Sequence, residues 1–288
     1  MKTVTTIAEV REAVAMARRK GKRIGFVPTM GDLHDGHMAL IAAALRETDS
    51  IVVSIFVNPA QFGPGEDYEK YTRNLEHDGQ SCSEAGVDVL FAPSVQEMYP
   101  REQLTWVNVE KLSEPLCGQS RPGHFRAVAT VCAKLFNIVQ PDIAFFGRKD
   151  AQQAVIIKRM ARDLNMPLRI VVCPTVREAD GLAMSSRNKY LSAQERKDAA
   201  IIYAALKKCG DLLLQGVVEA GVLEKCIRQT IEQMPSTQIE YIGIMDGDIL
   251  KPVDRTGDKT LVAVAVRIGS TRLIDNLIFE APGKRLSL

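Results

Sequence analysis

The stretch "RIGFVPTMGDLHDGHMALIAAALRETDSIVVSIFV", residues 23–57, decides the fold class of this chain. It begins with a short apolar segment, residues 23–27, which predicts a strand. Residues 37–48 repeat apolar side chains at helical spacing. The continuous, mostly β-branched run of residues 50–57 is typical of a strand buried on both sides of a parallel sheet. Together these segments predict a strand–helix–strand unit.

The same alternation continues through the first two thirds of the chain. Further strand-like runs are "VDVLFAP" (87–93), "DIAFFG" (142–147) and "LRIVVCP" (168–174), and helical patterns cover residues 67–86, 129–139 and 151–164. Such alternation indicates βαβ units, so we expect an α/β fold built on a doubly wound parallel sheet. Ligands of these sheets bind beyond the carboxyl ends of the strands. The residues after each strand are therefore the candidates for chemistry.

The pattern changes after about Tyr190. Residues 192–216 predict a helix that begins with a capping box, in which Glu195 follows Ser192 at the required spacing. A further helical pattern covers residues 221–234, and three strand-like runs joined by turns follow: "TQIEYIGIMD" (237–246), "KTLVAVAVRIGS" (259–270) and "TRLIDNLIF" (271–279). This α+β pattern predicts a smaller C-terminal domain. With a boundary near Val176, the expected domains are residues 1–176 and 177–288.

Composition and charge narrow the class of protein. The 288 residues suggest two domains or one large one, and a net charge of +2 argues against nucleic acid or an anionic membrane as the main partner. No apolar run reaches the ~18 residues of a membrane-spanning helix. Glu9, Arg11 and Glu12 interrupt the N-terminal segment, so we expect no secretory signal. The six scattered cysteines form no C-x-x-C pair, which favours reduced thiols and a cytoplasmic location over disulfides or zinc.

The first strand ends in "PTMGDLHDGH", residues 28–37. Gly31 allows a sharp turn, and Asp35 is a candidate cap for the helix that follows. The N–H groups and partial positive charge of a helix N-terminus favour phosphate. His34 and His37 are three residues apart, so they could donate to one anionic group. The alternative is one capping and one surface histidine, and the spacing leaves both possibilities open.

Polar residues also follow the next strand and a later one. Asn58 and Gln61 are neutral hydrogen-bonders, suited to a hydroxyl or carboxylate, although a polar turn explains them equally. In "FGRKD", Gly147 ends a strand, Lys149 could place a point charge on phosphate, and Asp150 could cap the next helix. A solvated loop is the alternative for this segment.

Two more segments could contribute to the same crevice. Gln152 and Gln153 begin the helix after "GRKD", and one of them could face the ligand. In "AMSSRNKYL", Ser185, Ser186 and Arg187 form a plausible phosphate clamp that closes over a nucleotide, with an interdomain linker as the alternative. The chain has no G-x-x-x-x-G-K-S/T loop, so a P-loop site is disfavoured.

Taken together, four of these segments resemble one family. "PTMGDLHDGH", "FVNPAQFGPGEDYEKYTRN", "RPGHFRAVATVCAKLFNIVQPDIAFFGRKDAQQ" and "VREADGLAMSSRNKYLS" occur in the order found in the pantoate–β-alanine ligases. "HDGH" is similar to the H-x-G-H signature of their nucleotidyltransferase superfamily. The resemblance implies a Rossmann-like domain with a C-terminal lid domain, a homodimer, and use of ATP and Mg²⁺. It also implies joining of (R)-pantoate to β-alanine through a pantoyl adenylate, with release of AMP and pyrophosphate.

Carried over position by position, the resemblance implies an ATP-binding set. Its members are Met30, Gly31, Asp32, Leu33, His34, Asp35, Gly36, His37, Gly147, Arg148, Lys149, Asp150, Val176, Met184, Ser185, Ser186 and Arg187. His37 takes the place of the family's general acid. His34 and Lys149 join it as catalytic residues that stabilise charge on the phosphates.

The resemblance also implies the substrate-binding residues. Gln61 matches the glutamine that contacts pantoate and β-alanine, and Gln153 the one that contacts pantoate. We add Asn58 to this set from its position after the strand. Two departures are Arg148, where the family often has glutamate, and His77, where acidic residues are common, which leaves the metal ligands open.

Two other functions compete with this interpretation. An adenylyltransferase of the same superfamily would keep AMP on its product, whereas a ligase releases it. A nucleotide-binding regulatory module would bind ATP without releasing pyrophosphate. In either case we expect small-molecule ligands, no nucleic acid and no membrane.

Overall fold

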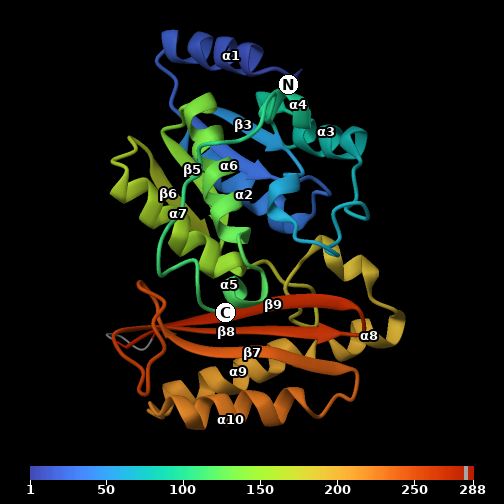
Figure 1. The fold of residues 1–288 in the computed structure, drawn as a ribbon, viewed down its shortest axis with the longest axis vertical. Coiled ribbons are helices and arrows are strands. Elements are labelled where there is room, and N and C mark those ends of the chain that lie inside the picture. The colour runs from blue at the N-terminus through green and yellow to red at the C-terminus, as the bar shows by residue number, and fades with distance from the viewer. Residues whose placement is uncertain (282–284) are drawn as a thin grey trace. The chain divides into compact units, whose positions relative to one another are not determined.

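The computed structural model describes residues 1–281 and 285–288 (Figure 1). The chain divides into two compact units. The first comprises Met1–Ser113, Ser120–Gly147 and Ile156–Cys173, and the second comprises Glu114–Gln119, Arg148–Val155 and Pro174–Leu288. The second unit therefore takes in two short internal segments in addition to the C-terminal part of the chain.

The first unit contains a six-stranded parallel sheet. In spatial order its strands are β1 (Lys2–Val4), β4 (Val89–Phe91), β3 (Ser50–Ile55), β2 (Ile24–Thr29), β5 (Ile143–Gly147) and β6 (Arg169–Cys173). This confirms the predicted doubly wound sheet, and the edge strand β1 is an addition to the prediction. The strand order reverses between β2 and β5, which is the switch point where such sheets bind ligands.

The helices of the first unit include the predicted ones, with the bounds of α3 corrected, and two that the sequence did not predict, α1 and α4. They are α1 (Ile7–Arg19), α2 (Asp35–Glu47), α3 (Leu75–Glu84), α4 (Val95–Met98) and α6 (His124–Val139), with a 3-10 turn η1 (Pro59–Gln61). Helix α3 is shorter than the helix predicted over residues 67–86. It starts late because Asn74 caps it, accepting a hydrogen bond from the N–H of His77.

Helices cover both faces of the central strand β2. Phe26 packs edge to face against Phe136 of α6, with ring centroids 6.4 Å apart. Its neighbour Val27 belongs to a buried cluster with Ile41 of α2. Because successive residues of a strand point to opposite faces, β2 is buried from both sides, as expected of a central strand in a parallel sheet.

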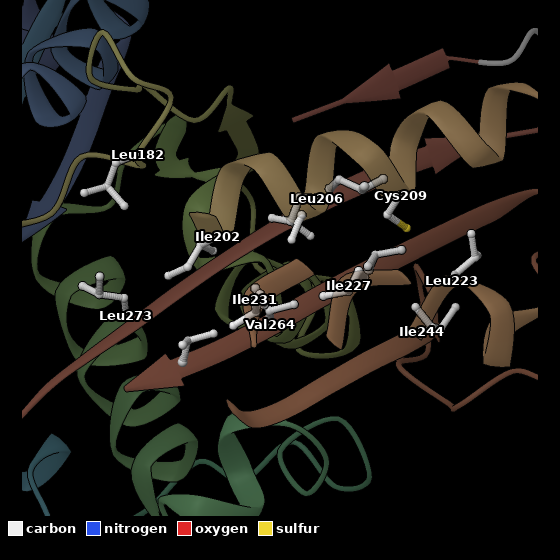
Figure 2. Packing of buried hydrophobic residues seen from close by; sticks show 14 of the residues in the cluster. Leu182, Ile202, Leu206, Cys209, Leu223, Ile227, Ile231, Ile244, Val264 and Leu273 are labelled. Atoms are coloured by element: carbon white, nitrogen blue, oxygen red, sulfur yellow. The ribbon is translucent and has the colours of Figure 1, made fainter. Parts of the chain in front are cut away.

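The second unit contains a four-stranded antiparallel sheet covered by helices. The strand order is β10 (Arg285–Ser287), β9 (Thr271–Glu280), β8 (Lys259–Ile268) and β7 (Thr237–Asp246), and the helices are α8 (Ala193–Asp198), α9 (Ile201–Leu214) and α10 (Ala220–Ile231). Leu206 and Ile227 from the helices pack against Ile244 and Val264 from the strands (Figure 2). This arrangement confirms the α+β prediction.

The capping box predicted at the start of this unit's helices is present. Ser192 and Glu195 exchange both side-chain hydrogen bonds with each other's backbone N–H. The single helix predicted over residues 192–216 is wrong in one respect, because α8 ends at Asp198 and α9 begins at Ile201. Among the described residues, none of the helices is both long and apolar enough to cross a membrane.

Candidate active site

The turn between β2 and α2 takes its shape from a buried carboxylate on α3. Asp78, which is 1% exposed, accepts hydrogen bonds from the N–H of Asp32 (2.9 Å) and of Leu33 (2.8 Å). Gly31 (φ 88°) and Asp32 (φ 52°) both adopt left-handed backbone, which is uncommon outside glycine. A Cβ on Gly31 would lie 2.9 Å from Asp78 Oδ2 and 3.0 Å from Ile55 Cγ2. The turn is therefore tightly specified and has no room for a side chain at Gly31.

The start of α2 brings the two histidines together. His34 is the capping residue and accepts from the N–H of Gly36 through Nδ1 (3.1 Å), so the prediction that Asp35 caps this helix is wrong. His37 Nδ1 in turn accepts from the N–H of His34 (3.3 Å), and the ring centroids are 4.1 Å apart. A ring nitrogen that accepts carries no proton, so each neutral imidazole has its N–H at Nε2. Two Nε2–H donors are thus fixed at a helix N-terminus.

The segment after β3 contains the predicted pair Asn58 and Gln61. Asn58 is fully buried and donates from Nδ2 to Gln61 Oε1 (3.0 Å). Its Oδ1 accepts from the N–H of Ala60 (3.3 Å) and from the hydroxyl of Tyr99 (3.0 Å). Burial raises the pKa of Tyr99 to about 12, which keeps this hydroxyl protonated at neutral pH. Asn58 therefore orients the Gln61 amide and exposes no surface of its own to a ligand.

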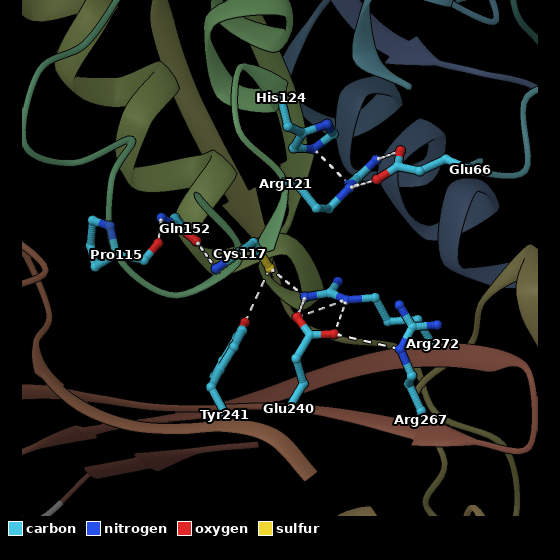
Figure 3. Close-up of polar contacts among 10 residues, drawn as sticks. All are labelled: Glu66, Pro115, Cys117, Arg121, His124, Gln152, Glu240, Tyr241, Arg267 and Arg272. Atoms are coloured by element: carbon cyan, nitrogen blue, oxygen red, sulfur yellow. Dashed lines mark hydrogen bonds and ion pairs between the residues drawn. The ribbon is translucent and has the colours of Figure 1, made fainter. Parts of the chain in front are cut away.

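A charged network surrounds the main-chain carbonyl of Gln61, and the sequence analysis missed it. Arg121 donates to both carboxylate oxygens of Glu66 (2.7 and 2.6 Å) and to His124 Nε2 (3.0 Å) (Figure 3). Arg121 and His124 Nδ1 both donate to Gln61 O (3.2 and 2.9 Å). Burial raises the pKa of Glu66, but the hydrogen bonds and charge of Arg121 outweigh it and keep the pKa below its ordinary value. The Pro–Gly turn of "RPGH" is the local sign that could have pointed to this network.

In the second unit, Lys149 lies on a short 3-10 turn. This turn, η2 (Arg148–Asp150), leads directly into α7 (Ala151–Asp163). Lys149 Nζ lies 3.6 Å from Asp150 Oδ1, and its side chain is partly exposed. Lys149 and Asp150 therefore present opposite charges at the start of α7, where a phosphate and its counter-ion could bind.

The two glutamines at the start of α7 have different roles. Gln152 is buried, donates to Pro115 O (2.7 Å) and accepts from the N–H of Cys117 (3.1 Å) (Figure 3). Gln153 is half-buried. Gln152 thus attaches residues 114–119 to α7, and Gln153 is the glutamine with surface left for a substrate.

The cysteine of the 114–119 segment contacts the sheet of the second unit. A hydrogen bond of 3.1 Å joins the Cys117 thiol and the Tyr241 hydroxyl, and Arg272 donates to Cys117 Sγ (3.5 Å). Arg272 also donates to both oxygens of Glu240 (2.7 and 2.9 Å), as Figure 3 shows. Burial raises the pKa of Tyr241, and the neighbouring Cys117 raises it further. These contacts explain why this short segment belongs to the second unit.

The Val176–Arg187 segment also lies in the second unit. The N–H of Met184 donates to Val176 O (3.0 Å), which closes the segment into a loop. Ser185 caps the 3-10 turn η3 (Ser186–Tyr190) by accepting from the N–H of Arg187 (3.3 Å). The predicted ATP-binding set is therefore divided: residues 30–37 and 147 belong to the first unit, and residues 148–150, 176 and 184–187 to the second.

The chain is similar to known proteins over almost its whole length. A family model described as pantoate-beta-alanine ligase matches residues 2–278. The chain is 54% identical over 280 residues to the pantothenate synthetase of Moorella thermoacetica, covering 97% of this chain and 99% of that protein. More than nine tenths of the chain is thus matched by both comparisons.

Solved structures agree with these matches. The pantothenate synthetase of Thermus thermophilus has a TM-score of 0.92 at 47% identity, covering 96% of this chain and 99% of that one. A pantoate-beta-alanine ligase from Francisella tularensis, solved in complex with beta-gamma ATP and beta-alanine, has a TM-score of 0.78 at 35% identity, covering 96% and 97%. The sheet order, the histidine pair and these likenesses lead to one conclusion: the chain belongs to the pantoate–β-alanine ligase family.

Proposed function

We propose that this protein condenses (R)-pantoate with β-alanine, using ATP, to give pantothenate, AMP and pyrophosphate. The observation that carries the proposal is the pair of imidazoles of His34 and His37 at the start of α2, each oriented by a main-chain N–H that donates to its Nδ1, after the switch-point strand β2. This is a site suited to an anionic phosphate. The Francisella relative, which was solved with an ATP and β-alanine, supports the choice of substrates.

In the first step a carboxylate oxygen of pantoate attacks the α-phosphorus of ATP. The bond between that phosphorus and the bridging oxygen breaks, and pyrophosphate leaves with the electron pair. His34, His37 and Lys149 would stabilise the negative charge on the phosphate oxygens, with Arg187 from the 184–187 segment. Such transfers depend on positioning and electrostatics and need no protein nucleophile.

In the second step the amine of β-alanine attacks the acyl carbon of pantoyl adenylate. The bond from that carbon to the phosphate oxygen breaks, AMP leaves, and the nitrogen loses a proton. Gln61 suits the recognition of pantoate, because Asn58 engages its Oε1 and leaves the amide NH₂ as a donor. Gln153 is the proposed second contact to pantoate. We assign Asn58 the role of positioning Gln61.

Magnesium fits this site best as part of the substrate. Among the described residues no cluster of three or more His, Cys, Asp or Glu side chains could cage a metal ion. Mg²⁺ usually keeps several waters and binds through phosphates plus one or two carboxylates, so we propose that it enters as MgATP. There it would neutralise charge on the phosphates. A homodimer and a cytoplasmic location are also proposed; the resemblance of the four sequence motifs to the family supports the first, and the scattered cysteines without a C-x-x-C pair support the second.

The proposed function is tested by a single-turnover quench with labelled ATP. ATP and pantoate alone should release pyrophosphate in an amount stoichiometric with enzyme, and a β-alanine chase should then release AMP. An adenylyltransferase would keep AMP on its product, and a regulatory module would release no pyrophosphate. If an enzyme active with all three substrates gives no pyrophosphate burst without β-alanine, the two-step account is wrong.

The role of the histidine pair is tested in the same assay. His37→Ala should slow pyrophosphate release by ~10²–10³-fold, because loss of one donor aimed at developing charge typically costs that much. Its effect on ATP affinity should be much smaller. The matched control is Gln80→Ala, which removes an exposed polar side chain on α3. If His37→Ala turns over as fast as the control variant, the catalytic role proposed for His37 is wrong.

A further inference from the structure

Strand β9 carries two buried polar residues in succession, Asp275 and Asn276, in the middle of the second unit's sheet. Asp275 is 3% exposed and Asn276 is 2% exposed. They pair with Val264 and Ala263 of β8 and lie between apolar residues of β9, Leu273 and Ile274 on one side and Leu277 and Ile278 on the other. Burial of a polar group is costly unless it is hydrogen-bonded, so the partners of these two residues indicate why they are there.

Asn276 binds the turn that carries Lys149. Its Nδ2 donates to the carbonyl oxygens of Arg148 (3.0 Å) and of Lys149 (2.9 Å). The opposite orientation of the amide would place Oδ1 against two carbonyl oxygens, so this orientation is the one that the contacts allow. Through these two bonds, β9 sets the position of the main chain on either side of the Lys149 Cα.

Asp275 binds the base of the loop that leads to Arg187. Its oxygens accept from Arg177 Nη1 (2.7 Å) and Nη2 (3.1 Å). The guanidinium of Arg177 lies 4.7 Å from the centre of the Tyr203 ring, and it also donates to Gly181 O (3.0 Å). Arg177 and Ala183 form a β-bridge that closes the loop, just before residues 184–187. Residues 184–187, the proposed phosphate clamp, follow this anchored loop directly in the chain.

The two contacts lie on opposite faces of one strand and are joined to each other. Successive strand residues point to opposite faces, so Asp275 and Asn276 reach different segments. Asp275 Oδ1 also accepts from the N–H of Asn276 (2.8 Å). Both 3-10 turns, η2 with Lys149 and η3 with Arg187, pack against β9.

We propose that Asp275 and Asn276 are positioning residues that set the geometry of the second unit's nucleotide-binding segments. The inference rests on the proposed function, in which Lys149 and Arg187 act on the phosphates of ATP. Asp275 and Asn276 are buried, so we propose that they act through other residues. Asn276 acts through Lys149, and Asp275 acts through Arg177 and the loop that ends at Arg187.

A double-mutant cycle with Lys149 tests the action of Asn276. Asn276→Asp is nearly isosteric but faces the two carbonyl oxygens with an acceptor. We expect it to slow pyrophosphate release from ATP and pantoate by ~10²-fold, as a displacement of about 1 Å in a reacting group can do. In the Lys149→Ala background, Asn276→Asp should slow pyrophosphate release by a further factor of less than about three, because the lysine side chain that Asn276 positions is already absent.

Two further variants separate positioning from folding. Thr260→Ala removes a fully buried hydroxyl of β8 in the same sheet, one that accepts from the N–H of Gly257. It should lower the midpoint of thermal unfolding and leave the rate unchanged. Asn276→Ala, which adds no charge, should show the same non-additivity with Lys149→Ala as Asn276→Asp and serves in its place if the aspartate variant does not fold.

The outcomes distinguish the inference from the function on which it rests. If the wild-type protein releases no pyrophosphate with pantoate, the proposed function fails and the inference with it. If Lys149→Ala keeps the wild-type rate, Asn276 has nothing to act through and the inference is overturned. If the wild type and Lys149→Ala behave as expected but the Asn276 variants are fully active, or their losses multiply with that of Lys149→Ala, only the inference fails.

Discussion

At the scale of single residues, the proposed function distinguishes side chains that would present a group to a ligand from those that orient such a group. We propose His34, His37 and Gln61 for the first kind, and Asn58 for the second. The distinction rests on burial and on donor direction, because Asn58 is fully buried and gives its Nδ2 to Gln61 Oε1. Because Asn58 donates to the oxygen of the Gln61 amide, the group that Gln61 has left for a ligand is its NH₂.

The first prediction concerns the hydrogen bond from Asn58 to Gln61. Asn58→Asp keeps the acceptor for Ala60 and Tyr99 but removes the donor to Gln61, so the Gln61 amide should turn and present Oε1 in place of NH₂. We expect kcat/KM for pantoate to fall about tenfold or more, equivalent to roughly 1.4 kcal/mol. The KM for ATP should stay near the wild-type value.

Tyr99→Phe is the control for this residue pair. It removes the hydroxyl that donates to Asn58 Oδ1 and leaves the contact of Asn58 with Gln61 in place. Steady-state kinetics with pantoate as the varied substrate should show a clearly smaller change than in Asn58→Asp. Equal effects of the two variants would contradict the proposal that Asn58 orients the Gln61 amide.

At the scale of elements, the β2–α2 turn depends on a helix much later in the chain. Asp78 on α3 accepts two consecutive main-chain N–H groups of this left-handed turn, those of Asp32 and Leu33. A carboxylate can take two such donors at once, because it has two oxygens and no proton of its own. The position of the histidine pair therefore depends on how α3 packs.

The second prediction concerns this support. Asp78→Ala should lower the free energy of unfolding by about 2–4 kcal/mol, because two buried N–H groups lose their acceptor at ~1–3 kcal/mol each. Denaturant unfolding measures the change. Glu76→Ala, an exposed position on the same helix, should change stability by less than ~0.5 kcal/mol. A stability of Asp78→Ala within error of this control would show that the two bonds contribute nothing.

At the scale of the whole molecule, five of the six cysteines are buried. Cys82, Cys117, Cys132, Cys173 and Cys209 are buried, and Cys226 is half-buried. Burial raises the pKa of the Cys82 thiol to about 11 and those of Cys132 and Cys209 to about 12. Such thiols remain protonated and out of reach of reagents near neutral pH.

The third prediction is a thiol count. At pH 8 a thiol-specific chromogenic reagent should react quickly with Cys226 alone in the folded protein, and with all six cysteines after denaturation. Cys226→Ser should remove the fast phase and leave catalytic activity unchanged. Rapid reaction of several thiols in the native protein would mean that the cores open more readily than their burial implies.

The sequence by itself determined most of the elements of this protein and indicated its chemistry. The apolar periods of the Arg23–Val57 stretch and of later runs place strands β2 to β9, because periods of 2 and 3.6 residues are local properties of a chain. The polar residues after the strands, above all the histidines of "HDGH", indicated an anion site at a helix start. Four ordered motifs then indicated the family, which the comparisons established.

Only the tertiary structure decided which residues support that site. His34, and not the predicted Asp35, caps α2, because its ring nitrogen reaches the N–H of Gly36. Asp78 lies 46 positions from Asp32, and Asn276 lies 128 positions from Arg148. Hydrogen bonds over such separations leave no periodic trace in the sequence, because they form only when packed sheets and helices bring distant segments within about 3 Å of each other.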